Sequence, residues 1–235
     1  MRFNLLQRSP QLHHPIHTTF IRYHHFSPSR SMKLSHPTFA LAFAASTIAQ
    51  YDVKSPPFHL IVLSDDDAVN GTTISACHSG AAIESLCLST GNSPSNPSPI
   101  APATFYFNTS TNTQPASPGS TPGVLGYDLP TGTTPIPSTL DLYVDPTSNY
   151  AQPMFYPGYS GQTLAVDAQD LFNIQGYVDY SVNPPKAGDN VAYYRWYVCI
   201  TYFTGYQYRN VVWGLGDEEP ETPGCVKVDL KRVFL

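Results

Sequence analysis

Residues 193–203 read YYRWYVCITYF, and residues 207–215 read QYRNVVWGL. Both stretches are dense in aromatic and β-branched side chains, which favour the pleated surface of a strand. Residues 193–203 are apolar or aromatic on both faces, as are residues 58–63, FHLIVL. A strand with apolar side chains on both faces is typically covered on both sides. We therefore expect residues 193–203 and 207–215 to form a hairpin at the centre of a β protein.

The rest of the chain after residue 50 alternates between short apolar segments and clusters of Pro, Gly, Asn and Ser. Residues 140–145 and 226–231 alternate strictly between apolar and polar side chains, the period of a strand with one buried face. The pattern predicts no long helix, and only a single helical turn at residues 80–85. It predicts twelve strands, at residues 58–64, 72–77, 85–89, 104–108, 124–129, 140–145, 153–156, 163–166, 171–177, 193–203, 207–215 and 225–233.

These strands predict a single all-β domain over residues 52–235, and we expect a two-sheet β-sandwich or jelly roll. A β-trefoil also uses twelve strands, but it is the second choice because the sequence shows no threefold repeat. Two segments rich in Ser, Thr and Pro, residues 89–122 and 130–138, are expected to form surface loops.

The N-terminal part of the chain has the composition of targeting sequence. Residues 32–49, MKLSHPTFALAFAASTIA, combine a basic Lys33, an apolar stretch and small residues up to Ala49, which is the order of a secretory signal peptide. Residues 1–31 contain Arg and Ser but neither Asp nor Glu, so they are either an over-long gene start or a mitochondrial transit peptide. We favour the first interpretation, because a signal peptide follows, and we expect an extracellular, secreted product.

Charge is distributed unevenly between these two parts. All 17 acidic residues lie beyond Ala49 but only seven of the 12 Lys and Arg do, so the mature chain carries about 17 minus 7, or ten net negative charges. Such a chain is poorly suited to bind nucleic acid or an anionic membrane. We expect no membrane anchor, because no second apolar run is long enough to span a bilayer and the C-terminus lacks the hydrophobic tail of a lipid-anchor signal.

The four cysteines, Cys77, Cys87, Cys199 and Cys225, all lie in the mature region. An even number of cysteines in a secreted chain predicts disulfides. Three pairings are possible, and we favour the one between sequence neighbours, Cys77 with Cys87 and Cys199 with Cys225. A zinc site is disfavoured because the first two cysteines are not spaced as C-x-x-C.

Two sequons, Asn70-Gly71-Thr72 and Asn108-Thr109-Ser110, make Asn70 and Asn108 candidate N-glycosylation sites. The acidic triplet 65–67 resembles a fragment of a calcium loop, but the spacing of oxygen ligands is incomplete. We interpret the triplet as a solvated turn between two strands, and we predict no metal site and no cofactor.

The segment CHSGAAIESLC at residues 77–87 offers His78, Glu84 and Ser79 as a catalytic group of base, acid and nucleophile. Neighbouring residues in a disulfide loop rarely achieve the required chain of hydrogen bonds, so we favour a stapled turn. A glycosidase needs two carboxyl groups across a sugar cleft, and the candidates Glu84, Asp141, Asp179 and Asp229 lie in no recognisable signature. We therefore assign no catalytic residue.

Aromatic side chains are the more suggestive feature. Exposed tyrosines on a β surface offer flat faces and hydroxyl groups that suit stacking against sugars. Most of the rings in residues 193–213 are expected to fill the core. The candidates for a ligand surface are Tyr159, Tyr197, Tyr206 and Tyr208.

Several segments together resemble an uncharacterised family of small secreted all-β proteins of filamentous fungi. They are 58–62, the Cys77–Leu88 box, the FYPGY segment at 155–159, the YYRWYVC segment at 193–199, and CVKVDLKRV at 225–233. The resemblance covers nearly the whole mature chain. It implies an all-β secreted product and carries over no activity and no catalytic residues.

The sequence thus leaves three functional hypotheses. The first is a non-catalytic secreted protein of the cell wall or cell surface that binds polysaccharide or cell-wall glycan through aromatic rings. The second is a wall-active glycoside hydrolase with an unrecognised pair of carboxylates. The third is a passive structural or effector-like scaffold without a small ligand.

Overall fold

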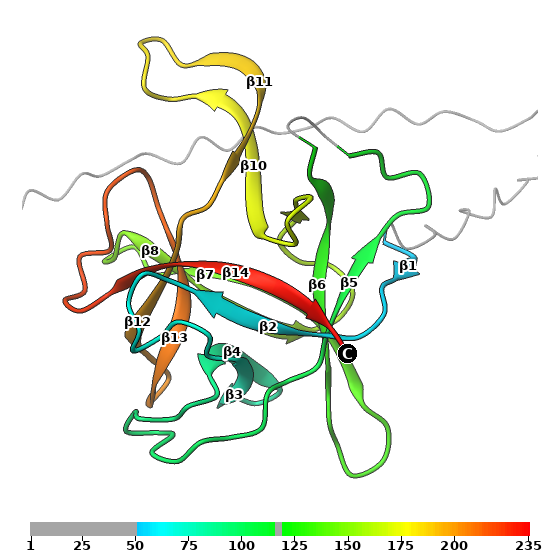
Figure 1. Ribbon diagram of the computed structural model, residues 1–235, viewed down its shortest axis with the longest axis vertical. Coiled ribbons are helices and arrows are strands. Elements are labelled where there is room, and N and C mark those ends of the chain that lie inside the picture. The colour runs from blue at the N-terminus through cyan, green and yellow to red at the C-terminus, as the bar shows by residue number, and fades with distance from the viewer. Residues whose placement is uncertain (1–50, 116–118) are drawn as a thin grey trace, which may run out of the picture. The chain divides into compact units, whose positions relative to one another are not determined.

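The structure is a computed structural model that describes residues 51–115 and 119–235, so the predicted leader and signal peptide lie outside the described residues. The described residues form fourteen strands and no helix (Figure 1). The strands are β1 (Val53–Lys54), β2 (Phe58–Leu63), β3 (Ile74–Gly80), β4 (Ile83–Leu88), β5 (Phe105–Thr109), β6 (Thr121–Leu129), β7 (Ile136–Val144), β8 (Tyr150–Pro157), β9 (Leu164–Val166), β10 (Phe172–Asp179), β11 (Lys186–Tyr193), β12 (Trp196–Phe203), β13 (Tyr206–Gly214) and β14 (Val226–Phe234).

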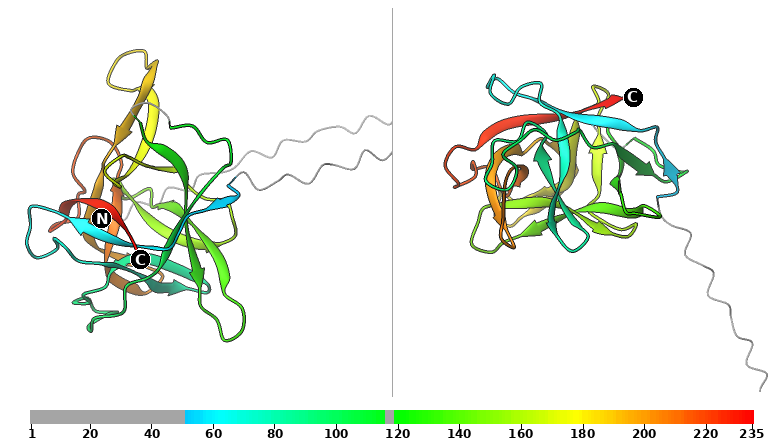
Figure 2. Two further views of the ribbon diagram at one scale, coloured as in Figure 1. Left: turned by 45° about the vertical axis from the view of Figure 1, so that its right-hand side comes forward. Right: turned by 90° about the horizontal axis from the view of Figure 1, so that it is seen from below.

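The strands are joined in one antiparallel network, in the order β1-β5-β2-β14-β12-β13-β4-β8-β7-β6-β9-β10-β11, with β3 paired to β4. The path folds back on itself, because β5 also pairs with β6 and β13 also pairs with β8. The two halves of the path therefore face each other across a shared interior, as two views show (Figure 2). This all-β arrangement confirms the predicted fold class and agrees with a sandwich-like or jelly-roll-like fold. The strand order contains no threefold repeat of the kind that a trefoil requires.

A single large hydrophobic core lies between the two halves. It takes side chains from β2, β12, β13 and β14 on one side and from β5 to β8 on the other. The rings of Phe105 and Phe155 stack at 5.7 Å, and those of Trp196 and Trp213 meet edge to face at 4.8 Å. The buried indole of Trp196 donates its N–H to the carbonyl oxygen of Phe172 at 2.8 Å. The hairpin β12–β13 is thus central, as its aromatic content predicts.

All twelve predicted strands correspond to observed strands, but β1 and β11 were not predicted. The predicted strand 193–203 is divided, because the chain leaves β11 at Tyr193 and enters β12 at Trp196. The strand 58–63 is fully covered on one face only. Phe58, Leu60 and Val62 alternate into the core, while His59 and Ile61 on the other face are half-buried and Leu63 is exposed.

The predicted helical turn at residues 80–85 is wrong. The chain instead reverses between β3 and β4 as a hairpin, with Ala82 at a positive φ of 58°. Strand β4 also pairs with β8 and β13, so its backbone hydrogen-bonding groups are used by the sheet, which a helical turn at these residues would prevent.

The cysteines form the two predicted local disulfides, Cys77–Cys87 and Cys199–Cys225, with Cα–Cα distances of 5.8 and 4.4 Å. The first links the strands of the β3–β4 hairpin. The second links β12 to the start of β14 and thereby closes the loop that contains β13.

The hairpin β10–β11, here called the arm, stands away from the rest of the domain (Figure 1). Its base is joined to β9, and its outer strand β11 is exposed over most of its length. The register of the pair shifts between Gly176 and Val178, so the arm twists away from the path of the sheet.

Candidate ligand-binding cleft

A cleft of about 800 Å³ lies where the base of the arm meets the loop that follows β13. It is lined by residues 175–181 of β10 and the following turn, by Tyr193 and Arg195, and by Gly216 and Asp217 of the loop. We call it the aromatic cleft. Its volume lies within the range of small-molecule and cofactor sites.

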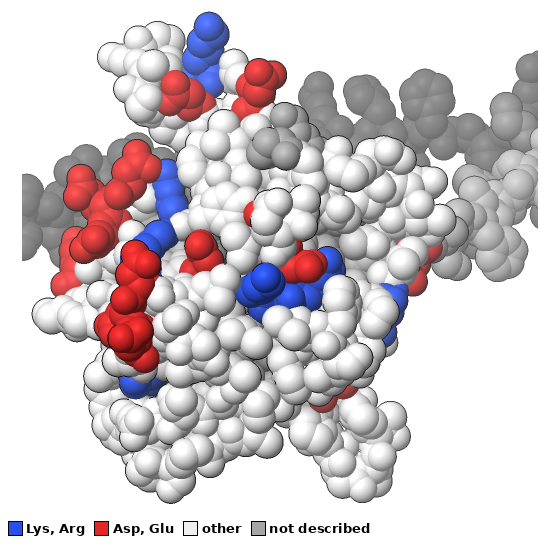
Figure 3. Space-filling model, viewed as in Figure 1, with Lys and Arg blue, Asp and Glu red and all other residues white. Residues whose placement is uncertain are grey.

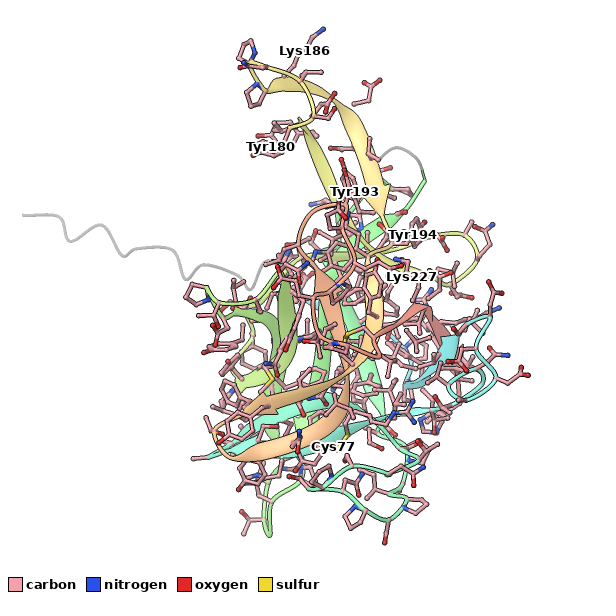
Figure 4. All side chains as sticks on the ribbon, turned by 90° about the vertical axis from the view of Figure 1, so that its left-hand side faces the viewer. Cys77, Tyr180, Lys186, Tyr193, Tyr194 and Lys227 are labelled. Atoms are coloured by element: carbon pink, nitrogen blue, oxygen red, sulfur yellow. A yellow bond between two sulfur atoms is a disulfide. The ribbon has the colours of Figure 1, made fainter. Side chains whose placement is uncertain are left out.

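Three tyrosines line the aromatic cleft. Tyr177 and Tyr180 are 60% and 79% exposed and line the same cleft, so their ring faces are open to a ligand. Tyr193 is half-buried, and its ring lies over Gly176 on the neighbouring strand. A Cβ atom at residue 176 would come within 3.2 Å of the Tyr193 ring, so the glycine allows this close approach. Figure 4 shows Tyr180 on the arm and Tyr193 near its base.

Charged groups complete the walls of the aromatic cleft. The guanidinium group of Arg195 lies 4.5 Å from the ring centroid of Tyr193 and forms an ion pair with Asp217 across the cleft. Asp179 accepts hydrogen bonds from the hydroxyl and the backbone N–H of Ser181, at 2.6 and 2.9 Å. Both bonds favour the ionised form and lower the pKa of Asp179. The walls of the cleft therefore contain polar side chains that are held by contacts with one another, namely Arg195 with Asp217 and Asp179 with Ser181.

The base of the arm is anchored beside the aromatic cleft by Tyr194 and Lys227. The hydroxyl of Tyr194 donates to Asp167 at 2.8 Å, and burial together with this carboxylate raises the pKa of Tyr194 to about 12. The ammonium group of Lys227 donates to the carbonyl oxygen of Tyr194 and lies 4.6 Å from the ring centroid of Tyr197. Burial lowers the pKa of Lys227. These contacts join β14 to the point where β11 ends (Figure 4).

The four tyrosines predicted as a ligand surface do not form one surface, and only Tyr206 and Tyr208 lie side by side. Tyr197 and Tyr208 are 8% and 6% exposed, so neither ring forms an exposed platform. Tyr197 packs with Cys199 and Val212, on the face that the second disulfide covers. Sequence alternation identifies the face of a strand to which a ring belongs, but not whether another segment covers that face.

Tyr208 is covered by the β3–β4 hairpin. Its hydroxyl donates to the carbonyl oxygen of His78 at 2.6 Å, and its ring packs on the Cys77–Cys87 disulfide. Tyr206 is half-buried and parallel to Tyr208, at 6.2 Å between centroids.

Tyr159 is 68% exposed and lines a separate pocket of about 330 Å³, which also contains Tyr106, Lys54 and Asn108. Tyr177 and Tyr180, by contrast, were not among the predicted candidates. The signal that was available for Tyr180 is its position between Asp179 and Ser181, beyond the end of the predicted strand 171–177.

His78 and Glu84 face each other across the β3–β4 hairpin, with 3.4 Å between His78 Nδ1 and Glu84 Oε1. Glu84 is buried, which raises the pKa of its carboxyl group, and the nearby His78 partly opposes this effect. The hydroxyl of Ser79 donates to the carbonyl oxygen of Cys77. The buried Ser79 is therefore not joined to His78 as the catalytic interpretation requires.

The remaining candidate carboxylates are separated. Asp179 lines the aromatic cleft, and Asp141 is exposed on β7. Asp229 lines a groove of about 490 Å³ together with Asp65 and Asp66, and burial raises its pKa. The described part of the chain contains no group of three or more His, Cys, Asp or Glu side chains placed to hold a metal ion.

The acidic triplet 65–67 forms part of a turn, as predicted. The carbonyl oxygen of Asp66 accepts the backbone N–H groups of Val69 and Asn70. Asn70 is exposed in this turn. Asn108 lies within β5, paired on both sides, and its Oδ1 is buried.

Comparison with known proteins identifies the family of this chain but no characterised relative. Residues 55–234 match the family described as Domain of unknown function (DUF7907). No curated protein and no solved structure matches the chain. Over residues 51–115 and 119–235, no helix is long and apolar enough to cross a membrane.

Proposed function

We propose that this chain, which belongs to the family described as Domain of unknown function (DUF7907), is a secreted, non-catalytic protein that binds glycan in the aromatic cleft. The observation that carries the proposal is the presence of three tyrosines, two of them largely exposed, around one cleft of about 800 Å³. The two disulfides agree with an oxidising, extracellular environment.

Tyrosine suits sugar recognition for a physical reason. The face of a pyranose ring presents C–H groups, which pack against a flat aromatic ring, while the sugar hydroxyl groups need hydrogen-bond partners. Tyr177, Tyr180 and Tyr193 supply the rings, and Asp179 and Arg195 supply polar groups in the same cleft. The arrangement therefore offers both kinds of contact that a saccharide requires.

The aromatic cleft favours binding over hydrolysis. A glycosidase needs one carboxyl group that remains protonated near neutral pH to act as the general acid. The two carboxylates that line the cleft are Asp179, whose pKa is lowered, and Asp217, which pairs with Arg195. Asp179 is therefore a poor proton donor, and the other carboxylate is engaged by the guanidinium group of Arg195.

The hydrolase hypothesis finds its best support at Asp229 instead, because its pKa is raised and it shares a groove with Asp65 and Asp66. Release of reducing sugar ends from a polysaccharide, lost in an Asp229→Asn variant, is the result that would favour this second function.

The glycan proposal is tested by retention of the purified protein on chitin, β-glucan and mannan, followed by calorimetric titration with soluble oligomers. We expect retention on at least one polymer. Replacing Tyr180 with alanine should weaken binding about tenfold or more, as for other exposed aromatic anchors. The matched control is Tyr202→Ala, because Tyr202 is 68% exposed on β12 and does not line the cleft.

Three outcomes would count against the proposal. Failure to bind any of the three polymers and any soluble oligomer, including oligomers of glucosamine, contradicts glycan binding. Equal losses for Tyr180→Ala and Tyr202→Ala would show that the cleft is not the site. A loss confined to Tyr159→Ala would move the site to the pocket beside Asn108.

A further inference from the structure

An acidic loop borders the aromatic cleft. Asp217 lines the cleft, and Glu218, Glu219 and Glu221 follow it in the loop between β13 and β14. All four residues are exposed. Figure 3 shows acidic side chains gathered over this loop. Because consecutive Cα atoms are about 3.8 Å apart, Glu218 and Glu219 start within about one Debye length of the cleft wall at physiological salt.

The acidic loop is held in place by contacts that do not involve its carboxylates. The side-chain amide of Asn149 donates to the carbonyl oxygen of Glu219 at 2.8 Å and accepts the backbone N–H of Glu221 at 2.8 Å. The Cys199–Cys225 disulfide closes the loop on its C-terminal side. The carboxylates therefore face solvent from a fixed backbone, which preserves their effect on an approaching ligand.

The segments that border the aromatic cleft carry a net negative charge. The cleft lining itself contains Asp179, Asp217 and Arg195 as its charged side chains, and Lys227 lies beside the base of the arm. Residues 175–195 and 214–224 contain six carboxylates and two cationic side chains, which gives 2 minus 6, or a net charge of −4. One of the cations, Arg195, already contacts Asp217 and Tyr193. The other, Lys186, lies at the far end of the arm (Figure 4). A ligand that enters the cleft therefore meets carboxylates with few free positive charges to balance them.

We propose that the glycan recognised by the aromatic cleft is cationic, a polymer of amino sugars whose amines are free and protonated. This inference rests on the proposed glycan-binding function and assigns its ligand class. Carboxylates along the cleft attract such a polymer, and they repel uronic-acid polymers. The exposed tyrosine faces add to the selection, because an ammonium group is attracted to the face of an aromatic ring.

The test compares hexamers of glucosamine, N-acetylglucosamine and galacturonic acid, with oligolysine as a cation that has no sugar ring. Binding is measured by calorimetry at about pH 5.5, where the amines are protonated and exposed carboxyl groups are ionised. We expect the glucosamine hexamer to bind most tightly. Its binding should weaken at least about fivefold when the ionic strength is raised from about 0.05 M to about 0.5 M.

Two double variants locate the effect. Glu218→Gln combined with Glu219→Gln should weaken binding of the glucosamine hexamer about fivefold, the effect of losing two exposed ion pairs. The control, Asp67→Asn combined with Asp141→Asn, changes the net charge equally at two exposed positions that do not line the cleft and should leave binding unchanged. Neither variant should alter binding of the N-acetylated hexamer.

The outcomes separate this inference from the function on which it rests. Equal or tighter binding of the N-acetylated or acidic hexamer would overturn the cationic ligand class and leave glycan binding intact. Equal losses in the two double variants would assign the attraction to net charge and overturn the role of the loop. Oligolysine binding as tight as that of glucosamine, and unaffected by Tyr180→Ala, would contradict sugar recognition altogether. Failure of all four ligands to bind would overturn the cationic ligand class, and failure of β-glucan and mannan oligomers as well would contradict glycan binding.

Discussion

Replacing Cys199 and Cys225 together with alanine opens the covalent loop that encloses β13 and the acidic loop beside the aromatic cleft. The two cysteines are separated by 26 positions along the chain. In the chain-entropy model, a link over this separation removes enough freedom from the unfolded chain to stabilise the fold by about 3.5 kcal/mol at room temperature. The same model gives about 2.7 kcal/mol for Cys77–Cys87, whose separation is 10.

The assay is equilibrium unfolding in urea, followed by tryptophan fluorescence, because Trp196 and Trp213 both lie in the core. With a denaturant dependence of about 2 kcal/mol per molar urea, a loss of 3.5 kcal/mol moves the midpoint down by about 1.7 M. The Cys77→Ala, Cys87→Ala double variant is the matched control and should move the midpoint less. Loss of sulfur contacts adds to both values, since three of the four cysteines are buried.

The difference expected between the two disulfides comes from loop length, and the two double variants test it directly. A loss below about 1 kcal/mol for the Cys199–Cys225 bond would show that the link constrains the unfolded chain little. A larger loss for the shorter loop would show that local packing at the β3–β4 hairpin outweighs chain entropy.

Two further predictions concern single side chains. Burial raises the pKa of the Glu84 carboxyl group, so the folded protein binds the carboxyl proton more tightly than the unfolded chain does. The stability that this proton adds is complete below the ordinary pKa of 4.5. It is lost as the pH rises through the raised pKa of the folded state. The glutamine of a Glu84→Gln variant stays neutral at every pH. The free energy of unfolding of the variant, relative to that of the wild type, should therefore increase between about pH 3.5 and about pH 7. A difference in the free energy of unfolding that does not change with pH would contradict this prediction. Asn70 is exposed in a turn, whereas Asn108 lies within β5. When the protein is expressed through a eukaryotic secretory pathway, Asn70→Gln should therefore remove one N-glycan and Asn108→Gln should remove none, as measured by mass spectrometry. A glycan found on Asn108 alone would be the opposite result.

Much of the fold could be predicted from local pattern. Period-2 alternation and turn residues located twelve strands, and the spacing of the cysteines favoured the observed pairing. The arm was the main omission. Strand β11 reads KAGDNVAY, and its Gly, Asp and Asn are poor strand formers. It is extended because it pairs with β10, which is a tertiary contact and leaves little signal in its own sequence.

The candidate site could be predicted less well than the fold. The sequence identified aromatic rings as the feature of interest but favoured Tyr197 and Tyr208, which the structure buries. The aromatic cleft depends on Gly176 admitting the ring of Tyr193 and on Arg195 reaching Asp217, 22 positions along the chain. Neither contact can be predicted from a local sequence pattern, because each joins residues that are far apart along the chain.

The sequence by itself determined twelve of the fourteen strands, the negative charge of the domain and the local disulfides. These properties depend on composition and on residues close together along the chain. Only the tertiary structure decided which tyrosines remain exposed and which carboxylates border the same cleft. Strand pairing brings distant segments into contact, and the burial of a side chain depends on the segment that covers it. The type of a residue alone does not indicate which segment will cover its side chain.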